Sequence, residues 1–579
     1  QTRVSGGMAA TSAGRADVNV TARDNVQVRS RTVSGRTVGG SVGAEGNVSI
    51  SSAQGAITVD REIGASKGFA QLAAQAGVTT GNITSLTGFV DVQAKTGPVQ
   101  VGDLYGLVGK PAPTTGPADP CAGNAICVQA GTGGTATSTT NYTVSTGTIR
   151  TDNTASGNVL VGGANGVQTG AIDINNGSVA LNSSQGAINV GSVGLSGSSI
   201  GKSVVANARG KVTMGNIVAG SGSIDLQSAN DELVLARVSG GGDVRLRSAA
   251  NLTVDLSKVD AGGVASFTST GGELRVGTVS GSNFTPGDLN QTLGAVELSG
   301  QTGVTVGNVA ARDGASLQSA AGSINAGEVV SSGGAVQVTA ANDVNLRRAQ
   351  GTAATIASNT GRIRVGTTSG SSFVGGNVNA TTGAASVSAR TGVEAADITG
   401  GTTATVNVAE GAVVARALFV GNGAAFVSGR DGVSVTSASA PNGSIDLIAN
   451  QGAVKVGSTS GSTFSGGQVN AGRGGVRIDA RDEIATGNVT ASSWVKIGSE
   501  SSKVSLGNVS ASAAHTSDDE CNGKSVCIGA AFDSANGSGQ TLTVGSVTAS
   551  AGDVLLFSRN GVTANGAVTV SRGELVVSG

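Results

Sequence analysis

The chain has 579 residues and a formal charge of −1, with 95 glycines and only 2 % aromatic residues. Hydrophobic residues still make up 38 % of it, which excludes intrinsic disorder, and the balanced charge gives no electrostatic footprint for nucleic acid. Glycine does not recur at every third position and no run of about 18 apolar residues occurs, which excludes collagen and a membrane-spanning helix.

Repeated units of about 20 residues, each opened by a glycine, run along the chain. Gly222, Gly242 and Gly263 each begin a run that alternates apolar and polar residues, and they follow one another at nearly equal spacing. Later units open in the same way at Gly334 and Gly443. Alternation with period two predicts short strands with one buried face, and the Gly, Asn, Ser and Asp between them predict tight turns.

Three short strands per unit cannot bury their apolar faces alone, so the units must stack. We expect an all-β fold, a right-handed parallel β-helix with one coil per unit, running as a single continuous domain over residues 1–579. Stacking at ~4.8 Å per coil then gives a rod of roughly 100–130 Å. An up-and-down barrel is the alternative, but its two-residue hairpin turns are not evident in the repeat.

Two segments interrupt the repeat, residues 102–141 with four of the seven prolines, and residues 510–540 with the only histidine. Each holds two cysteines in a C-x5-C spacing. The pairs are Cys121 with Cys127, and Cys521 with Cys527. We expect both segments to leave the β-helix as long loops with a disulfide at each tip, which implies an oxidising compartment. The spacing does not fit a redox C-x-x-C motif, and the two pairs are too far apart along the chain to share a metal ion.

A longer repeat of about 90 residues is superimposed on the short one. The segment Val-Gly-Thr-Val-Ser-Gly-Ser-Asn-Phe ends at Phe284 and recurs with small changes, ending at Phe373 and then at Phe464. Each copy adds about 11 residues to one coil, so we expect four coils and one excursion per superrepeat, all projecting from one side. The excursions are expected at 280–293, 369–382 and 460–473.

Phe284, Phe373 and Phe464 are the most regular bulky residues in a chain poor in aromatics. They are candidate contact points for a receptor, a glycan or a neighbouring filament. The structural alternative is that each ring folds back and plugs the widened coil. The sequence pattern fits both interpretations.

Carboxylates and the histidine are the remaining candidates for chemistry. His515 is followed by Asp518, Asp519 and Glu520, which are competent metal ligands but are also typical of a solvated acidic loop. We favour the solvated loop and expect no metal ion and no cofactor.

Asp479, Asp482 and Glu483 form the densest acidic group, beside Arg477 and Arg481. Enzymes that cleave acidic polysaccharides on a parallel β-helix need clustered carboxylates or a calcium site on one face. Here charges of opposite sign interleave, which predicts a solvated surface with salt bridges between neighbouring coils and no enzymatic activity.

The coil pattern G-x-[VI]-x-[LIV]-x-[SA]-x-x-G-x-[VI]-x-[VA]-G-x-[VI] resembles that of the filamentous-haemagglutinin-type exoproteins, the two-partner secretion adhesins of Gram-negative bacteria, from about Gly46 to Gly573. The resemblance implies a right-handed β-helix outside the cell, an outer-membrane secretion partner, and a role in adhesion, aggregation or biofilm. The chain lacks the Asn-Pro dipeptide of that family's secretion domain and begins without a signal peptide. We therefore expect a shaft segment of a longer protein.

The function predicted from these features is structural. We expect a non-enzymatic rod of an extracellular bacterial adhesin or surface fibre, presenting its loops to a cell-surface receptor, a glycan or a matrix. Open coil ends also invite pairing with other copies of the chain. A polysaccharide-cleaving enzyme on the same fold is the alternative.

Overall fold

The computed structural model describes all residues except 1, 6–7, 11–15, 35, 133–140, 153–156, 196–201, 256–257, 281–282, 292, 371, 517–518 and 531–539. The described residues form strands, turns and bends but no helix, and so none that could cross a membrane. Their contacts divide the chain into two units, residues 1–301 and 302–579. Each unit is described by itself, and the single continuous domain stays a prediction.

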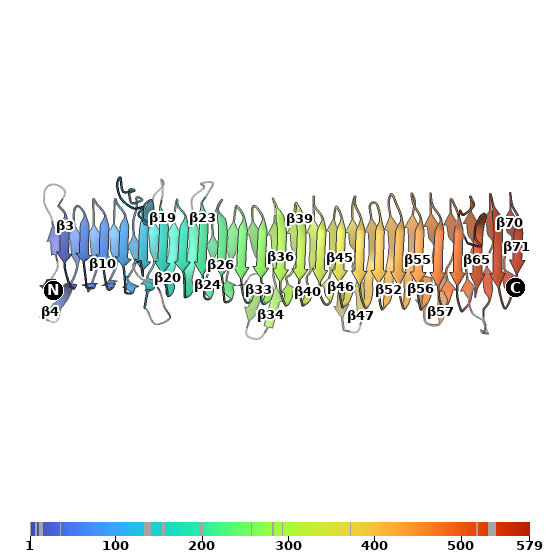
Figure 1. The fold of residues 1–579 in the computed structure, drawn as a ribbon, viewed down its shortest axis with the longest axis horizontal. Coiled ribbons are helices and arrows are strands. Elements are labelled where there is room, and N and C mark those ends of the chain that lie inside the picture. Colours follow the sequence, from blue (N-terminus) through green and yellow to red (C-terminus); the bar gives the residue numbers. More distant parts are fainter. Residues whose placement is uncertain are drawn as a thin grey trace. The chain divides into compact units, whose positions relative to one another are not determined.

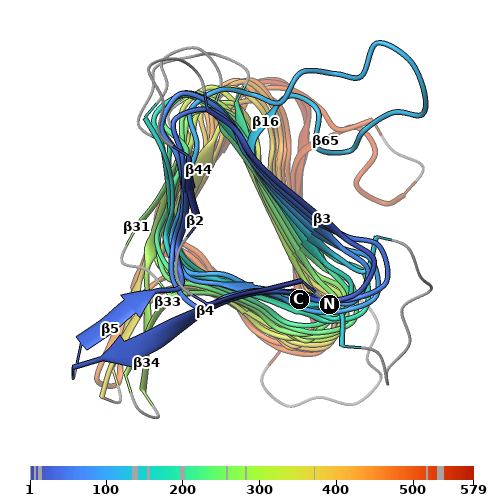
Figure 2. The same ribbon diagram turned by 90° about the vertical axis from the view of Figure 1, so that its left-hand side faces the viewer.

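Each complete coil has three sides, with one strand on face 1 and, in most coils, one strand on each of faces 2 and 3. In some coils a single longer strand runs along both of these faces, as β20 (Gly166–Ile174) and β50 (Gly392–Gly400) do. In unit 1, β7 (Val48–Ser52) lies on face 1, β8 (Ile57–Val59) on face 2 and β9 (Ile63–Ala65) on face 3, and β10 (Ala70–Ala74) returns to face 1. Each strand pairs in parallel with its equivalent one coil on, as Val48 does with Ala70. Figure 2 shows the three sides, with β3 (Val18–Ala22) on face 1, β4 (Val26–Val33) on face 2 and β2 (Met8–Ala10) on face 3.

The strands of face 1 form a sheet of their own in each unit (Figure 1). In unit 1 the other described strands of this face are β13 (Val90–Ala94), β16 (Asn124–Ala130), β19 (Asn158–Gly163), β21 (Val179–Ser183), β23 (Ser203–Ala208), β26 (Ser223–Ser228), β29 (Val244–Ser248), β32 (Ala265–Ser269) and β36 (Ala295–Gly300). In unit 2 they are β39 (Gly314–Ser319), β42 (Val336–Ala340), β45 (Ala354–Ser358), β49 (Ala385–Ala389), β51 (Ala404–Val408), β53 (Ala425–Gly429), β55 (Ile445–Ala449), β59 (Val476–Ala480), β62 (Val495–Ser499), β65 (Lys524–Ala530), β68 (Asp553–Ser558) and β71 (Leu575–Ser578).

The register between coils measures the repeat directly. On face 1 of unit 2, Ala385 lies opposite Ala404, which lies opposite Ala425, which lies opposite Ile445. Each step of this series is one coil of about 20 residues. The predicted parallel β-helix is therefore confirmed in the described part of each unit, with the predicted coil length. Its hand stays a prediction.

The interior consists of aliphatic side chains stacked in register. On face 1 of unit 1, Leu226, Leu246 and Phe267 lie opposite one another in successive strands, and all three are fully buried. Burial of one such side chain stabilises the fold by about 1.5–3 kcal/mol, and the stack repeats this contribution coil by coil. A narrow interior lined from three sides admits few large rings, which accounts for the low aromatic content.

Serine and glycine make the corner that follows face 1. In unit 2, the Ser358 hydroxyl donates a hydrogen bond to the Asn342 carbonyl of the preceding coil (2.6 Å) and accepts one from the Gly361 N–H (3.0 Å). At the equivalent corner Gly452 passes so close to the preceding coil that a Cβ would collide with the Asp431 carbonyl oxygen. Backbone groups in these corners thus bond between coils, and glycine is required where the coils touch.

Candidate functional site

Each predicted excursion of the longer repeat is an antiparallel β-hairpin between face 2 and face 3. The pairs are β33 (Glu273–Ser280) with β34 (Asn283–Pro286), β46 (Arg362–Ser369) with β47 (Ser372–Gly375), and β56 (Ala453–Ser460) with β57 (Thr463–Gly466). Across the second of these coils the face 1 register advances from Ala354 to Ala385, about 11 residues more than across an ordinary coil. An insertion of this size was predicted, whereas the antiparallel pairing was not. The predicted bounds lie too late in the sequence, because each hairpin begins earlier and the later part of each predicted range contains a parallel strand of face 3. These strands are β35 (Asp288–Gln291), β48 (Val378–Ala380) and β58 (Val469–Ala471).

The two hairpins of unit 2 leave the coil at the same corner, because β46 and β56 both belong to face 2. The strands between them on that face are β50 (Gly392–Gly400), β52 (Ala412–Val420) and β54 (Gly432–Ala440). Four coils at ~4.8 Å each separate the hairpins by ~19 Å. Figure 1 shows β47 and β57 along the same edge, as the superrepeat predicted.

The three repeated phenylalanines cover glycines within their own hairpins. The ring of Phe284 lies against Gly277, that of Phe373 against Gly366, and that of Phe464 against Gly457. These glycines have φ angles of 154°, 151° and 150°, a conformation that residues with a Cβ rarely adopt. All three rings are half-buried and pack on the hairpin backbone, so they do not plug the coil interior. Their role as contact points stays a prediction.

A fourth hairpin, in unit 1, was missed from the sequence. β4 pairs in antiparallel with β5 (Arg36–Gly39), again between face 2 and face 3. Ser34 in its turn has a φ of 48°, and Val33 and Val38 beside it are 45 % and 39 % exposed. The Ser34-Gly35 dipeptide between two short runs was the available signal, since left-handed turns favour such residues.

A disulfide anchors loop 1, which we define as residues 106–123, between β15 (Leu104–Tyr105) and β16. Cys121 near the end of the loop is bonded to Cys127 within β16, with Cα atoms 5.5 Å apart, and both side chains are fully buried. Because β16 pairs in parallel with β13 and β19, the range 102–141 is not a loop throughout. The bond also lies where the loop rejoins face 1 and not at its tip, which corrects the expectation from the sequence.

Loop 2, residues 512–523 between β64 (Val509–Ala511) and β65, is anchored in the same way. Cys521 is bonded to Cys527 in β65, with Cα atoms 5.6 Å apart, and β65 pairs with β62 and β68. The expectation of a loop over all of 510–540 is corrected here too, and residues 517–518 and 531–539 lie outside the described residues. In both places the loop covers the outer side of face 1, so the strand is buried on both sides and its period-two alternation is hidden.

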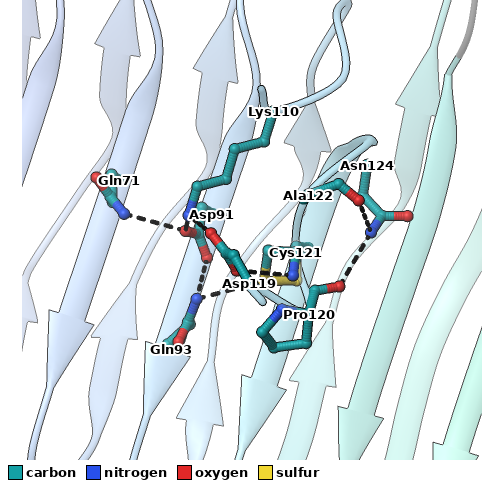
Figure 3. The surroundings of a disulfide bond; sticks show 10 residues. Gln71, Asp91, Gln93, Lys110, Asp119, Pro120, Cys121, Ala122 and Asn124 are labelled. Atoms are coloured by element: carbon teal, nitrogen blue, oxygen red, sulfur yellow. Dashed lines mark hydrogen bonds and ion pairs between the residues drawn. A yellow bond between two sulfur atoms is a disulfide. The ribbon is translucent and has the colours of Figure 1, made fainter. Parts of the chain in front are cut away.

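A buried ion pair lies under loop 1 (Figure 3). The Lys110 ammonium contacts the Asp91 carboxylate, whose side chain is 1 % exposed, and lies 2.7 Å from an oxygen of Asp119. Asp91 also accepts hydrogen bonds from the amides of Gln71 (3.1 Å) and Gln93 (2.9 Å). The charge of Asp91 is therefore neutralised by a cation and two amide donors, as a buried carboxylate requires.

This arrangement shifts the pKa values of Lys110 and Asp119. Burial alone would lower the pKa of Lys110, but hydrogen bonds to Asp119 and Asp91 outweigh it and raise that pKa. Burial would raise the pKa of Asp119, but the hydrogen bonds from Lys110 and from the Cys121 N–H lower it. The Lys110 ammonium also lies 5.7 Å from the centre of the Phe89 ring, a cation–π geometry. Loop 1 is thus fixed by a permanent charge cluster.

The corresponding position in loop 2 is His515. Its N–H donates to the Lys524 carbonyl (2.7 Å) and its carbonyl accepts from the Gly523 N–H (2.8 Å), just as Lys110 bonds to Asn124 and Gly123 in loop 1. The imidazole packs against the Trp494 indole with ring centres 4.0 Å apart. Burial lowers the pKa of His515, with Asp519 opposing that shift and Lys496 and Arg477 adding to it. Loop 2 therefore holds a neutral ring where loop 1 holds a cation.

Metal ligation has one geometric candidate among the described residues. One carboxylate oxygen of Asp91 and the sulfur atoms of Cys121 and Cys127 all lie within 4.8 Å of one another. The two sulfur atoms are bonded to each other and so are not available as thiolate ligands. Of the predicted set in loop 2, His515, Asp519 and Glu520 are described, and Asp518 lies outside the described residues.

The three acidic residues considered for polysaccharide cleavage, Asp479, Asp482 and Glu483, each contact different partners. Asp479, on the outer side of face 1, accepts a hydrogen bond from Arg477 at 2.5 Å. Glu483 lies between Lys503 (3.1 Å) and Lys455 (3.6 Å), and Asp482 accepts a hydrogen bond from the Ser501 hydroxyl at 3.4 Å. The salt bridges of Glu483 join neighbouring coils, as predicted, whereas Asp479 pairs with Arg477 of its own strand.

Asp479 also lines a groove of about 310 Å³ between face 1 and loop 2. Arg477, Lys496, Glu500 and Glu520 line the same groove, so it presents both signs of charge. Nearby, burial raises the pKa of Asp446, an effect that Arg477 opposes and Asp479 reinforces. The groove thus brings one of the predicted carboxylates next to a cavity of ligand size.

No family model matches this chain, and neither the curated proteins nor the solved structures contain a match to it. The resemblance to filamentous-haemagglutinin-type exoproteins therefore depends on the coil pattern, which the β-solenoid fold of each unit accommodates. The two disulfides indicate an oxidising environment outside the cytoplasm.

Proposed function

We propose that the chain is a shaft segment of an extracellular bacterial adhesin or surface fibre, of the filamentous-haemagglutinin type. The observation that carries the proposal is the repeated hairpin, which in unit 2 projects twice from one corner at a spacing of ~19 Å. A scaffold that repeats an exposed element at fixed spacing favours multivalent attachment, because each further contact is made at high effective concentration. The disulfides support an extracellular location, and an outer-membrane secretion partner follows from the resemblance.

The hairpins are suited to contact with another polypeptide edge. The segments 276–287, 365–378 and 456–469 contain no charged residue, and Asp288 follows directly after the first of them. Val279 and Val374 are 45 % and 63 % exposed. Uncharged edge strands with exposed valines lack the charges that normally block edge pairing. Attachment to other copies of the chain is thus part of the proposal.

Bead attachment tests this function. Beads coated with the full chain are expected to bind epithelial or bacterial cells and to aggregate with one another, and V374D is expected to reduce the aggregation. The matched control is T405D, which adds the same charge on face 1 in β51, away from the hairpins. Beads that attach neither to cells nor to one another would contradict the proposal.

The groove beside loop 2 favours a second candidate, a polysaccharide-cleaving enzyme, because it places Asp479 at a cavity of about 310 Å³. Incubation with polygalacturonate, alginate and hyaluronate distinguishes the two functions. New reducing ends or unsaturated uronates that disappear in D479N would establish the enzyme, and intact polymers would leave the shaft as the better account.

A further inference from the structure

The outer side of face 1 in unit 1 carries a strip of side chains without charge, next to loop 1. Two rows of outward-facing residues run in register across β16, β19, β21 and β23. The first row contains Leu160, Ala180 and Val205, and the second contains Gln129, Gly162, Asn182 and Asn207. We call these residues the uncharged strip. In the next two strands of the face, the position of the first row is occupied by the charged residues Asp225 and Arg245.

Apolar residues face outward at the same position of three successive strands in the strip. Leu160, Ala180 and Val205 are only partly exposed, whereas Asn182 and Asn207 beside them are exposed. The strip therefore has an apolar floor along one side and amide groups along the other. Apolar residues on the outer side contribute nothing to the coil interior, so the fold itself does not explain them.

Two adjoining concavities follow the amide row. One of about 450 Å³ is lined by Asn182, Asn207 and Gln227, and another of about 180 Å³ by Gln129, Gly162 and Asn182. Because Asn182 and Ser184 line both, they form one shallow groove that crosses the strands. Arg209 at the rim of the larger concavity donates a hydrogen bond to Gln185 (2.7 Å), so its charge is partly engaged.

The amides of the groove do not bond to one another. In unit 2, stacked asparagines do so, with Asn345 donating to Asn325 at 2.9 Å and Asn442 to Asn422 at 3.3 Å. Within the described part of the chain, the side chains of Asn182, Asn207 and Gln227 make no such bond. Asn182 and Asn207 are exposed, and each amide can both donate and accept a hydrogen bond.

We propose that the uncharged strip binds an extended, neutral polysaccharide chain lying across the strands. Sugar hydroxyls both donate and accept hydrogen bonds, which matches amides, and the C–H faces of pyranose rings match the apolar floor of Leu160, Ala180 and Val205. The coil spacing of ~4.8 Å repeats these contacts at about the length of one sugar unit in an extended β-linked chain. The strip itself has no charge, and the cation at the rim of the larger concavity, Arg209, already donates a hydrogen bond to Gln185, which disfavours an acidic glycan.

This inference deepens the proposed attachment function, on which its biological role rests. It assigns a ligand class and a site other than the hairpins. Because the ligand contacts several coils in turn, the affinity for each sugar is small and grows with the number of sugars bound. Long oligosaccharides are therefore expected to bind better than short ones.

Titration of the full chain with soluble oligosaccharides tests the proposal. The probes are cellohexaose, chitohexaose and maltohexaose as neutral ligands and pentagalacturonate as an acidic one, followed by calorimetry or by NMR of the sugar. We expect at least one β-linked neutral hexasaccharide to bind, with little effect of 0.5 M salt. The double variant N182A/N207A is expected to bind about tenfold more weakly, since two hydrogen bonds are lost.

Two further variants sharpen the test. V205D places a charge on the apolar floor and is expected to abolish binding, whereas N407A removes an exposed amide at the equivalent position of β51 in unit 2 and is expected to change nothing. Binding of pentagalacturonate alone, loss of binding in N407A, or no binding of any neutral probe would overturn the proposal. A change in oligomeric state of V205D without sugar binding would instead assign the strip to contact with a second copy. Since the ligands are soluble, these results are independent of the bead assay for attachment.

Discussion

Replacement of Lys110 by methionine tests the buried ion pair beneath loop 1. Methionine keeps the length and volume of the side chain but removes its charge. The Asp91 side chain, which is 1 % exposed, would then retain only the amides of Gln71 and Gln93 as donors. Removal of one partner from a buried ion pair costs about 3–5 kcal/mol, and we expect about 3 because loop 1 can open and admit water to Asp91.

The matched control is the ion pair under loop 2. There, Lys496 and Asp519 have side chains that are 25 % and 41 % exposed, compared with 13 % for Lys110. Solvent screens this pair, so K496M is expected to cost less than about 1 kcal/mol. The two substitutions are chemically identical, but K110M leaves the buried Asp91 and also Asp119 without their cation, whereas K496M leaves the more exposed Asp519.

Hydrogen exchange measured by mass spectrometry reports the local effect, because a solenoid does not unfold in one step. A loss of about 3 kcal/mol corresponds to a fall of roughly a hundredfold in the protection of loop 1 and of β13 and β16. K496M should change protection in loop 2 by less than about fivefold.

The pH range of this effect follows from the two pKa shifts. The raised pKa of Lys110 gives stability that is present below the unfolded pKa of lysine and is lost as pH rises through the folded value. The lowered pKa of Asp119 gives stability that is present above its unfolded pKa and is lost as pH falls through the folded value. The difference between wild type and K110M should therefore persist from about pH 4 to about pH 10. Equal losses in K110M and K496M at pH 7 would refute the reasoning.

Three other predictions follow from the same structure. Because the pKa of His515 is lowered in the folded chain, the unfolded chain binds more protons at this residue, and the protection of loop 2 should fall as pH drops below 6.5. Hydrogen exchange at pH 7.5 and pH 5 measures this fall, and H515Q should remove it. F373A uncovers Gly366 and should raise exchange in its hairpin about fivefold to tenfold while leaving face 1 unchanged; an unaffected hairpin would contradict the packing seen here. L447A opens a cavity in the fully buried stack and should cost about 2–5 kcal/mol in local unfolding, whereas F426A, on the 36 % exposed outer side, should cost less despite removing more atoms.

The coil period could be predicted because each strand shows its alternation of buried and exposed residues within a few consecutive positions. Runs such as that of β55, in which Ile445 and Leu447 alternate with polar residues, show one buried side in the sequence itself. The length of each excursion was equally accessible, since it is a count of residues between glycine-led runs. The hairpin pairing could not be predicted from alternation, because the hairpins consist mostly of Gly, Ser and Thr and lack regularly spaced apolar residues.

The positions of the cysteines were harder to predict because their burial is not local. Ile126, Cys127 and Val128 are all buried, since loop 1 covers the side of β16 that would otherwise face solvent. A strand buried on both sides loses its alternation and is indistinguishable from a loop in a chain this rich in glycine. The partnership of Lys110 with Asp91 likewise depends on a loop folding back over the preceding coil, which no spacing in the sequence encodes.

Loops 1 and 2 are attached to face 1 by the same backbone contacts but by different charged side chains. The frame consists of a disulfide, two backbone hydrogen bonds and an aromatic ring, and it is the same in both loops. Within it the charges are exchanged: the strand supplies an anion, Asp91, under loop 1 and a cation, Lys496, under loop 2. Each frame also holds one carboxylate, Asp119 or Asp519, which accepts a hydrogen bond from the N–H of the first cysteine. A cation can therefore be supplied from either side, by Lys110 of loop 1 or by Lys496 of the strand, and the position of Lys110 is free for the titratable His515. We therefore expect the attachment of loop 1 to be constant near neutral pH and that of loop 2 to weaken in acid, even though the two loops share the disulfide and both backbone hydrogen bonds.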